Sequence, residues 1–235
     1  MPDDALTAAD LADLRALDTP TICNALEIIL PARRGIGFTT KPLVCARPDL
    51  PPIVGYARTA TIRATHPAEG DAKASRQLRL DYYRHVSEGP GPRIVVLEDL
   101  DAEPGYGAFW GEVNSNIHKG LGCEGVITNG SIRDIPACAE GFQLLAGRVG
   151  PSHAHVHIVE IALTVTVHGM TVRPGDLIHG DQHGAVVIPP EAARHIPATA
   201  AQIARRESHI IGASQQPDFS YEKLARTLAE ADEIH

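Results

Sequence analysis

Two short polar patches in the middle of the chain carry groups that could do chemistry together. The first is Gly111-Glu112-Val113-Asn114, at the start of an apolar helix pattern, and the second is Arg133-Asp134. Amides at a helix start lack acceptors and lie at the positive end of the helix dipole, so this start could hold a carboxylate. Arg133 adds a guanidinium, and Asp134 adds a carboxylate that could bind Mg²⁺. A 2-oxo acid held against a divalent metal ion needs these groups together.

Taken singly, each patch is a weak signal. Every helix has an N-terminus, and an adjacent Arg and Asp on a loop often form a surface ion pair that contributes little stability. Their positions make the pair informative, because both patches are expected just after the C-terminal ends of parallel strands. Ligand crevices of open α/β sheets form at that edge.

A strand–helix–strand unit is predicted to bring the two patches together. The short apolar run Arg93–Glu98 follows a Gly-Pro cluster and predicts a buried strand. Val113, Ile117 and Leu121 recur every fourth residue and predict a helix with one apolar stripe. Gly125–Asn129 predicts the next strand. A connection of this kind predicts parallel pairing through a right-handed crossover.

The rest of the chain predicts further strands and helices around this unit. Thr7–Leu30 is expected to hold two helices, because Asp18 can cap a second helix with Pro20 in its first turn. The other expected elements are strands at Val54–Arg63, Val156–Val167, Leu177–Ile178 and Ala185–Ile188, a loop at Leu43–Pro52, and helices at 191–211 and after Ser214.

Composition limits the classes of protein that the chain can belong to. The net charge of −8 argues against nucleic acid as a partner, since phosphate binding needs a clustered basic surface. No apolar run approaches the roughly 18 residues of a membrane span, so no membrane partner is expected. The acidic start Met1-Pro2-Asp3-Asp4 does not resemble a signal peptide, and the four cysteines form no CxxC pair. A cytoplasmic protein with reduced thiols is therefore expected.

The motifs of this sequence resemble those of the RraA-like family, from about Asp18 (Asp-Thr-Pro-Thr-Ile-Cys-Asn-Ala-Leu) to about Pro189. The most specific part is the acidic residue of Gly111-Glu112, twenty intervening residues, and then Arg-Asp at the end of Gly125-Val126-Ile127-Thr128-Asn129-Gly130-Ser131-Ile132-Arg133-Asp134. The turn Val172-Arg173-Pro174-Gly175-Asp176, with Asp181 and Gly184, supports the resemblance independently. The family includes 4-hydroxy-4-methyl-2-oxoglutarate aldolases, which also decarboxylate oxaloacetate, and the regulator of ribonuclease activity A.

The resemblance implies an α/β fold of the αββα sandwich type, with N- and C-terminal helices. It also implies a homotrimer or homohexamer whose active sites lie between subunits. Residues 1–235 are expected to form one domain with a core at about 18–190. The C-terminal extension, about 191–235, is a candidate intersubunit arm.

The resemblance also assigns roles to the residues of the two patches. Arg133 would bind the substrate carboxylate and stabilise the developing enolate, and Asp134 would be the one direct protein ligand of Mg²⁺ or Mn²⁺. Glu112 would hold metal-bound water, at a position where aldolase members carry an acidic residue, usually Asp. The expected substrate-binding residues are Gly111, Val113, Asn114, Arg133 and His155.

Two positions bear on how much of the family's site is present. Aldolase members use a Glu from the C-terminal helix of a neighbouring subunit, and Glu207 is the candidate by position, with a solvated helix residue as the alternative. Aldolase members also carry an acidic residue three positions after the Arg-Asp pair, where this chain has Ala137. That departure removes a water-orienting carboxylate and puts the aldol partner in doubt, but it leaves the metal and pyruvyl contacts.

A histidine cluster and two lysines offer other chemistry. His153, His155 and His157 are expected on one strand face, where a strand presents two Zn²⁺ ligands but rarely three. A pocket or intersubunit role for one of them, and plain solvated histidines, both stay open. Lys73 and Lys119 lie outside apolar strands, so a Schiff-base mechanism, which needs a desolvated lysine, is not expected.

These residues favour a divalent-metal-dependent lyase, a class II aldolase with a decarboxylase side activity. It would cleave a small 2-oxo acid and release pyruvate, either by retro-aldol cleavage of a 4-hydroxy-2-oxo acid or by decarboxylation of oxaloacetate. Two alternatives stay open: a non-catalytic regulator of the ribonuclease-regulator type, and a family enzyme acting on another small hydroxy or oxo acid.

Overall fold

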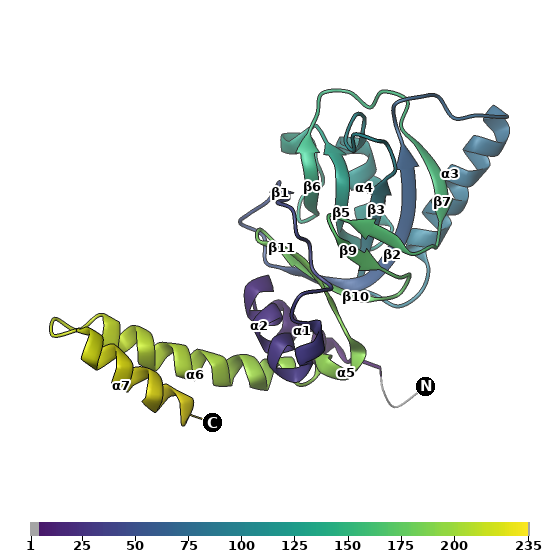
Figure 1. Cartoon of the computed structure of the whole chain (residues 1–235). Coiled ribbons are helices and arrows are strands. Elements are labelled where there is room, and N and C mark those ends of the chain that lie inside the picture. Colours follow the sequence, from purple (N-terminus) through teal and green to yellow (C-terminus); the bar gives the residue numbers. More distant parts are fainter. Residues whose placement is uncertain (1–4, 235) are drawn as a thin grey trace.

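A curled mixed β-sheet lies at the centre of the fold (Figure 1). The computed structural model describes residues 5–234, and within them the sheet has the strand order β1-β6-β5-β3-β2-β10-β11, with β4 beside β5 and β7 beside β2. Its strands are β1 (Val44–Cys45), β2 (Ile53–Arg63), β3 (Arg93–Asp99), β4 (Ala108–Trp110), β5 (Cys123–Ile132), β6 (Gln143–Val149), β7 (His157–Ile161), β10 (Leu177–Asp181) and β11 (Gly184–Ile188). The hairpin β8 (Val165–Val167) and β9 (Met170–Val172) forms a separate small sheet.

Helices flank this sheet and continue beyond it. They are α1 (Ala8–Arg15), α2 (Thr19–Ile29), α3 (Ala72–Ser87), α4 (Glu112–Gly120), α5 (Pro190–Ala193), α6 (Ile196–Ser214) and α7 (Tyr221–Asp232), with 3₁₀ turns at Pro31–Arg33 and Ile135–Ala137. Asp18 caps α2 by accepting a hydrogen bond from the amide of Thr21 at 2.8 Å, and Pro20 stands in the first turn. The expectation of two helices in Thr7–Leu30 is therefore confirmed.

The predicted strand–helix–strand unit is present as β3, α4 and β5. β3 and β5 pair in parallel, with Val95 opposite Val126. Unlike the prediction, β5 continues through Ile132, so Arg133 follows the last strand residue directly. The segment before α4 also contains β4, a three-residue strand that the apolar pattern did not predict and that pairs in parallel with β5.

Three apolar clusters show how the layers stack. One lies between the sheet and helices α3 and α4, and includes Tyr82 and Trp110. The second fills the space between β2, β3, β5 and β6 on one side and β8 to β11 on the other. The third packs α1 and α2 against β10 and β11. Helix, sheet, sheet and helix follow one another, so the predicted αββα architecture is confirmed.

A buried polar contact ties α2 to the sheet. Asp181, at the end of β10, accepts a hydrogen bond from the amide of Thr19 at 2.9 Å. The Thr19 hydroxyl lies 3.0 Å from Nδ1 of His179, whose Nε2 lies 2.9 Å from the carbonyl oxygen of Leu17. Since these groups are buried, the contacts satisfy polar atoms that would otherwise cost stability.

Two local expectations from the sequence are wrong, and one helix was missed. The expected strand Val156–Val167 is two strands, β7 and β8, because Ala162 between them adopts a left-handed φ of 60°. The expected loop Leu43–Pro52 contains β1, which pairs antiparallel with β6. Helix α3 was not anticipated, although Asp71 caps it by accepting a hydrogen bond from Lys73.

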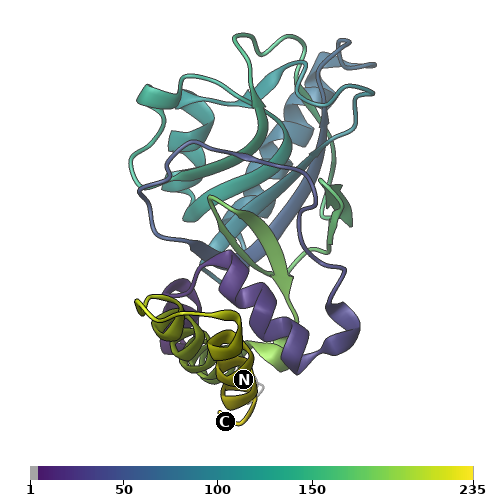
Figure 2. The same ribbon diagram turned by 60° about the vertical axis from the view of Figure 1, so that its left-hand side comes forward.

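The C-terminal helices form an arm that extends away from the sheet (Figure 1, Figure 2). The start of this arm, α6, packs on α2, and α7 folds back along α6, where Arg206 bonds the carbonyl oxygen of Ala231 at 2.9 Å. No helix within residues 5–234 is long and apolar enough to cross a membrane, and all four cysteines are free thiols. Met1–Asp4, which carry the expectation of no signal peptide, lie outside the described residues.

Candidate functional site

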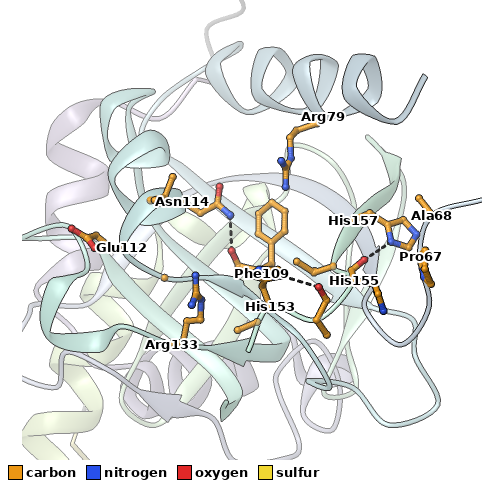
Figure 3. Close-up of a pocket in the computed structure, with 15 residues that line it drawn as sticks. Pro67, Ala68, Arg79, Phe109, Glu112, Asn114, Arg133, His153, His155 and His157 are labelled. Atoms are coloured by element: carbon orange, nitrogen blue, oxygen red, sulfur yellow. Dashed lines mark hydrogen bonds between the residues drawn. The ribbon is translucent and has the colours of Figure 1, made fainter. Parts of the chain in front are cut away.

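A pocket of about 530 Å³ opens where β4 meets α4 (Figure 3). Four further parts of the chain complete its walls: the loop at Pro67 and Ala68, Arg79 of α3, Arg133 after β5, and residues 153–157. A volume of this size suits a small organic ligand. The pocket therefore lies at the carboxyl ends of β4 and β5, the edge that the sequence indicates.

Gly111 brings the two polar patches into contact. A Cβ built on it would lie 2.8 Å from Oδ2 of Asp134 and 3.1 Å from Cγ of Arg133. The Arg133 amide donates to the carbonyl oxygen of Trp110 at 2.9 Å, which joins the end of β5 to the residue before Gly111. Residues 22 positions apart in the chain thus meet because β4 and β5 are neighbours.

The side chains of Arg133 and Asp134 remain available to a ligand. Each is partly exposed, at 36% and 38%, and Arg133 Nε lies 3.6 Å from Oδ2 of Asp134. That approach is the only polar contact of the Arg133 guanidinium with residues 5–234. Asp134 has a left-handed backbone, φ 54° and ψ 31°, which turns the chain sharply after the strand. The guanidinium and the carboxylate therefore stand side by side, with Arg133 in the lining of the pocket and Asp134 next to it.

The start of α4 presents backbone amides to the same pocket. Gly111 is the N-cap residue and has no side chain to accept hydrogen bonds from the first turn. Gly111, Glu112, Val113 and Asn114 all line the pocket. The hydroxyl of Ser115 donates to the carbonyl oxygen of Glu112 and accepts from the amide of Ala139, both at 2.9 Å, which ties the helix start to the turn after Asp134. Uncapped amides with a fixed direction suit an anionic ligand.

A buried hydrogen-bond chain holds the side chain of Asn114. Its Nδ2 donates to the carbonyl oxygen of Phe109 at 2.5 Å, and its Oδ1 accepts from the Tyr83 hydroxyl at 2.8 Å. The carbonyl oxygen of Asn114 lies 2.6 Å from Nδ1 of His118, whose Nε2 lies 2.7 Å from the Tyr82 hydroxyl. Since a carbonyl only accepts, Nδ1 of His118 carries the proton and Nε2 accepts from Tyr82. The side chain of Asn114 is thus used internally, which leaves its backbone amide to the pocket.

Stability is expected to depend on pH through His118. Burial lowers the pKa of this imidazole from 6.5 to about 4, so the folded protein keeps it neutral where the unfolded chain is protonated. The neutral His118 therefore favours the folded state fully above pH 6.5. As the pH falls from 6.5 to 4, the free energy of unfolding decreases by about 3 kcal/mol through this group. Chemical denaturation of the wild type and of His118→Gln at pH 7.5 and pH 4.5 measures it. The variant should lose less stability between the two; equal losses would contradict a neutral, buried His118.

The three histidines at 153–157 do not lie on one strand face, so that expectation is wrong. Ala154 has a φ of 46° and stands in a turn, and β7 begins only at His157. All three histidines nevertheless line the pocket, and Nδ1 of His157 lies 2.8 Å from the carbonyl oxygen of His155 (Figure 3). The turn thus forms one wall, with exposed imidazoles at positions 153 and 155.

Other candidate residues lie away from this pocket. Glu207 is exposed on α6 and does not line the pocket of its own chain. Ala137 is exposed in the 3₁₀ turn after Asp134. Lys73 and Lys119 also lie outside the lining. The structure brings residues 111–114, Arg133, Asp134 and His155 into one region. Glu207 lies apart from them on α6.

Two residues of α3, Arg79 and Tyr83, belong to the site but were missed in the sequence. Arg79 lines the pocket, and Tyr83 holds Asn114. Burial raises the pKa of Tyr83, and the nearby positive charge of Arg79 partly offsets this. The signal that could have found the helix is the four-residue spacing of Leu78, Tyr82 and Val86, the last two of which are fully buried.

The carboxylates of Glu112 and Asp134 fit one kind of metal site. Residues 5–234 contain no group of three or more His, Cys, Asp or Glu side chains arranged to hold a metal ion. An all-protein cage of the zinc type is therefore absent from this part of the chain. Mg²⁺ differs, because it keeps several waters and often binds through one or two carboxylates. The exposed carboxylate of Asp134, with Glu112 at the pocket wall, fits that chemistry.

Known proteins similar to this chain agree on its family. A family model described as "RraA-like: Aldolase/RraA" matches residues 19–187. A Halalkalibacterium halodurans protein named "Putative 4-hydroxy-4-methyl-2-oxoglutarate aldolase" is 29% identical over 181 residues, which are 76% of each chain. A Pseudomonas paraeruginosa protein of the same name is 34% identical over 107 residues, 44% of this chain and 57% of that protein.

Solved structures share the fold. An uncharacterized protein from Pseudomonas syringae pv. tomato superposes with a TM-score of 0.70 at 21% identity, covering 98% of this chain and 95% of that one. Streptomyces coelicolor RraAS2, described as "an unusual member of the RNase ES inhibitor RraA protein family", gives a TM-score of 0.65 at 22% identity, covering 88% and 98%. With a family match over most of its length and this shared architecture, the chain belongs to the RraA-like family.

Proposed function

We propose that this chain is a divalent-metal-dependent lyase that cleaves a small 2-oxo acid and releases pyruvate. The observation that carries the proposal is the close approach of Asp134 to Gly111 and Arg133, two residues that line one pocket. A guanidinium, a carboxylate and the uncapped start of α4 lie within reach of one small ligand there. The aldolase names of two family relatives favour the same class of reaction.

Some groups of the pocket would bind the substrate, and others would stabilise the charge that develops on it. The amides of Val113 and Asn114 would hold the substrate carboxylate at the start of α4. Arg133 would donate hydrogen bonds to the same end and to the 2-oxo oxygen, where negative charge develops as the C3–C4 bond breaks. Glu112 would orient a water molecule at the pocket wall. In the aldol case, the proton of the 4-hydroxyl group would pass to water or to a carboxylate.

Asp134 would hold the metal ion, with water and substrate oxygens as the other ligands. Its carboxylate is partly exposed and accepts no hydrogen bond from a residue in 5–234, with Nε of Arg133 3.6 Å away. When bound, Mg²⁺ or Mn²⁺ would supply Lewis-acid polarisation of the 2-oxo group. The close approach of Gly111 to Asp134 would keep this carboxylate at the start of α4.

The arm would complete the site from a neighbouring copy in a homotrimer or homohexamer. α6 and α7 extend away from the sheet, and Glu207 is exposed along α6 (Figure 1). Such an arm can reach a second copy, while Glu207 does not line the pocket of its own chain. Sedimentation of the full chain against a version ending at Ala204, which lacks Glu207 and α7 but keeps the part of α6 that packs on α2, tests this, and loss of the oligomer on truncation is expected.

Metal removal is expected to abolish turnover. Pyruvate release from oxaloacetate and from 4-hydroxy-2-oxoglutarate is measured with a lactate dehydrogenase coupled assay, in Mg²⁺ and in EDTA. Because oxaloacetate decarboxylates without any enzyme, the reference is the Asp134→Asn variant under identical conditions. The wild type should exceed this reference in Mg²⁺ and equal it in EDTA. Equal rates in both solutions, or no excess in either, would rule out the metal-dependent mechanism.

The same assay separates the alternatives. A regulator of the ribonuclease-inhibitor type, the description given to one structural neighbour, would show no metal-dependent pyruvate release and would bind a ribonuclease. A family enzyme for another small acid would release no pyruvate from these two substrates, yet a metabolite screen by thermal shift in Mg²⁺ would find a stabilising acid.

A further inference from the structure

Arg79 is a charged side chain at the pocket wall. It forms no hydrogen bond or ion pair with any residue in 5–234. Figure 3 shows its guanidinium pointing from α3 toward the ring of Phe109, on the opposite side of that ring from Arg133. Two guanidinium groups therefore face one pocket from different walls.

The surroundings of Arg79 suit an anion. Glu112 is the one carboxylate among the residues that line this pocket, and it belongs to the α4 start. The lining of the same pocket also contains the uncharged Pro67 and Ala68 and the imidazole of His155. On a chain of net charge −8, a guanidinium that faces a pocket and has no acidic partner is available to an acidic ligand.

Two contacts between α3 and α4 hold the backbone of Arg79 in place relative to the start of α4. Tyr83, one helical turn further along α3, donates from its hydroxyl to Oδ1 of Asn114 at 2.8 Å. Tyr82 beside it is fully buried and lies 2.7 Å from Nε2 of His118 on α4. These two contacts join α3 to α4, so the position of Arg79 is set relative to the amides of the α4 start. A fixed separation of two anion-binding groups selects ligands by length.

We propose that Arg79 is a specificity-determining residue that binds a second acidic group, at the end of the substrate far from the pyruvyl carboxylate. This rests on the proposed function, because it assumes that Arg133 and the α4 start hold the pyruvyl end. His155, which also lines the pocket, donates a further hydrogen bond to the same distal group in this proposal. The preferred ligand is then a 2-oxo diacid whose two carboxylates are separated by more than the single methylene group of oxaloacetate.

The two candidate reactions use a distal carboxylate differently. In retro-aldol cleavage of 4-hydroxy-2-oxoglutarate, the C3–C4 bond breaks, its electron pair forms the pyruvate enolate, and C4 becomes an aldehyde after its hydroxyl loses a proton. The distal carboxylate stays on the departing glyoxylate, so Arg79 can hold it throughout. In decarboxylation of oxaloacetate, the carboxylate itself leaves as carbon dioxide, and its negative charge passes to the enolate. A guanidinium bound to that carboxylate would stabilise the ground state and not the transition state.

The experiment compares Arg79→Met with Arg76→Met, a matched control on the same exposed helix that lines no part of this pocket. Substrates are 4-hydroxy-2-oxoglutarate, 4-hydroxy-2-oxopentanoate, which has a methyl group in place of the distal carboxylate, and oxaloacetate. Arg79→Met should lower kcat/KM for the first by about 10- to 100-fold, the range of a charged hydrogen bond, and leave the other two within about twofold. Arg76→Met should change none of the three. Equal losses on all three, or no loss on the first, would overturn the proposal.

A binding measurement without turnover keeps this test separate from the lyase proposal. Calorimetry in Mg²⁺ compares 2-oxoglutarate, which has a distal carboxylate and no bond to cleave by this route, with 2-oxopentanoate. The wild type and Arg76→Met should prefer the diacid, and Arg79→Met should lose that preference. If pyruvate is never released yet the preference depends on Arg79, the lyase proposal fails and the acid subsite stands. If pyruvate is released and Arg79→Met still prefers the diacid, only the proposal of an acid subsite at Arg79 is wrong.

Discussion

Replacing Arg133 with methionine is expected to lower kcat/KM for pyruvate release by about 10³-fold, with the fold retained. The guanidinium lies 3.6 Å from Oδ2 of Asp134 and beside Gly111 at the start of α4, and it has no other acceptor within residues 5–234. Its loss removes both the binding of the substrate carboxylate and the stabilisation of charge on the 2-oxo oxygen. Methionine keeps much of the side-chain length, so packing against Gly111 changes little.

Two further variants show which property of Arg133 matters. Arg133→Lys keeps the positive charge but lacks the planar fork that binds a carboxylate with two hydrogen bonds, so it should recover only part of the activity. Arg148→Met is the matched control, because Arg148 is exposed on the neighbouring strand β6 and lies outside the pocket. Steady-state kinetics and thermal unfolding of Arg133→Met, Arg133→Lys and Arg148→Met separate lost activity from lost stability. Full activity in Arg133→Met would place the pyruvyl carboxylate elsewhere.

The centre of the site could be predicted from the sequence because local patterns determine it. The apolar run of β3, the four-residue period of α4 and the strand that ends before Arg133 each have a recognisable pattern. Parallel pairing of β3 and β5 puts both patches at the same edge of the sheet, and β4 beside β5 then brings the start of α4 against the end of β5. For this reason Gly111 and Asp134 meet as expected.

Other parts of the site depend on contacts that no local pattern reveals. β4 has three residues and exists because it pairs with β5. Ala154 takes a left-handed φ of 46°, which an alanine seldom adopts, so its alternating histidine neighbours suggested a strand. Arg79 belongs to a mainly exposed helix whose apolar stripe is short, and only packing against α4 directs it to the pocket. The role of Glu207 depends on a second copy and not on the contacts of one chain.

A single methyl group at Gly111 is expected to lower kcat by about 100-fold with little loss of stability. In Gly111→Ala the new Cβ would lie 2.8 Å from Oδ2 of Asp134, so that carboxylate must move, and 3.1 Å from Cγ of Arg133, a tight contact that requires a small shift. The backbone there is extended, with φ −170°, so alanine adopts it without strain. An alanine N-cap costs about 1 kcal/mol, which lowers the melting temperature by only a few degrees. The lost activity would come from displaced side chains.

Gly120→Ala is the control that separates displacement from a general effect on α4. It adds the same methyl group to the last turn of the same helix, where a Cβ meets nothing within 4 Å. This variant should keep full activity and gain about 0.5–1 kcal/mol of stability, because alanine has lower backbone entropy in the unfolded chain. Kinetics in increasing Mg²⁺ add a second readout for Gly111→Ala. A displaced Asp134 should raise the Mg²⁺ concentration needed for half-maximal activity, whereas wild-type activity and metal dependence would show that this close contact is not part of the site.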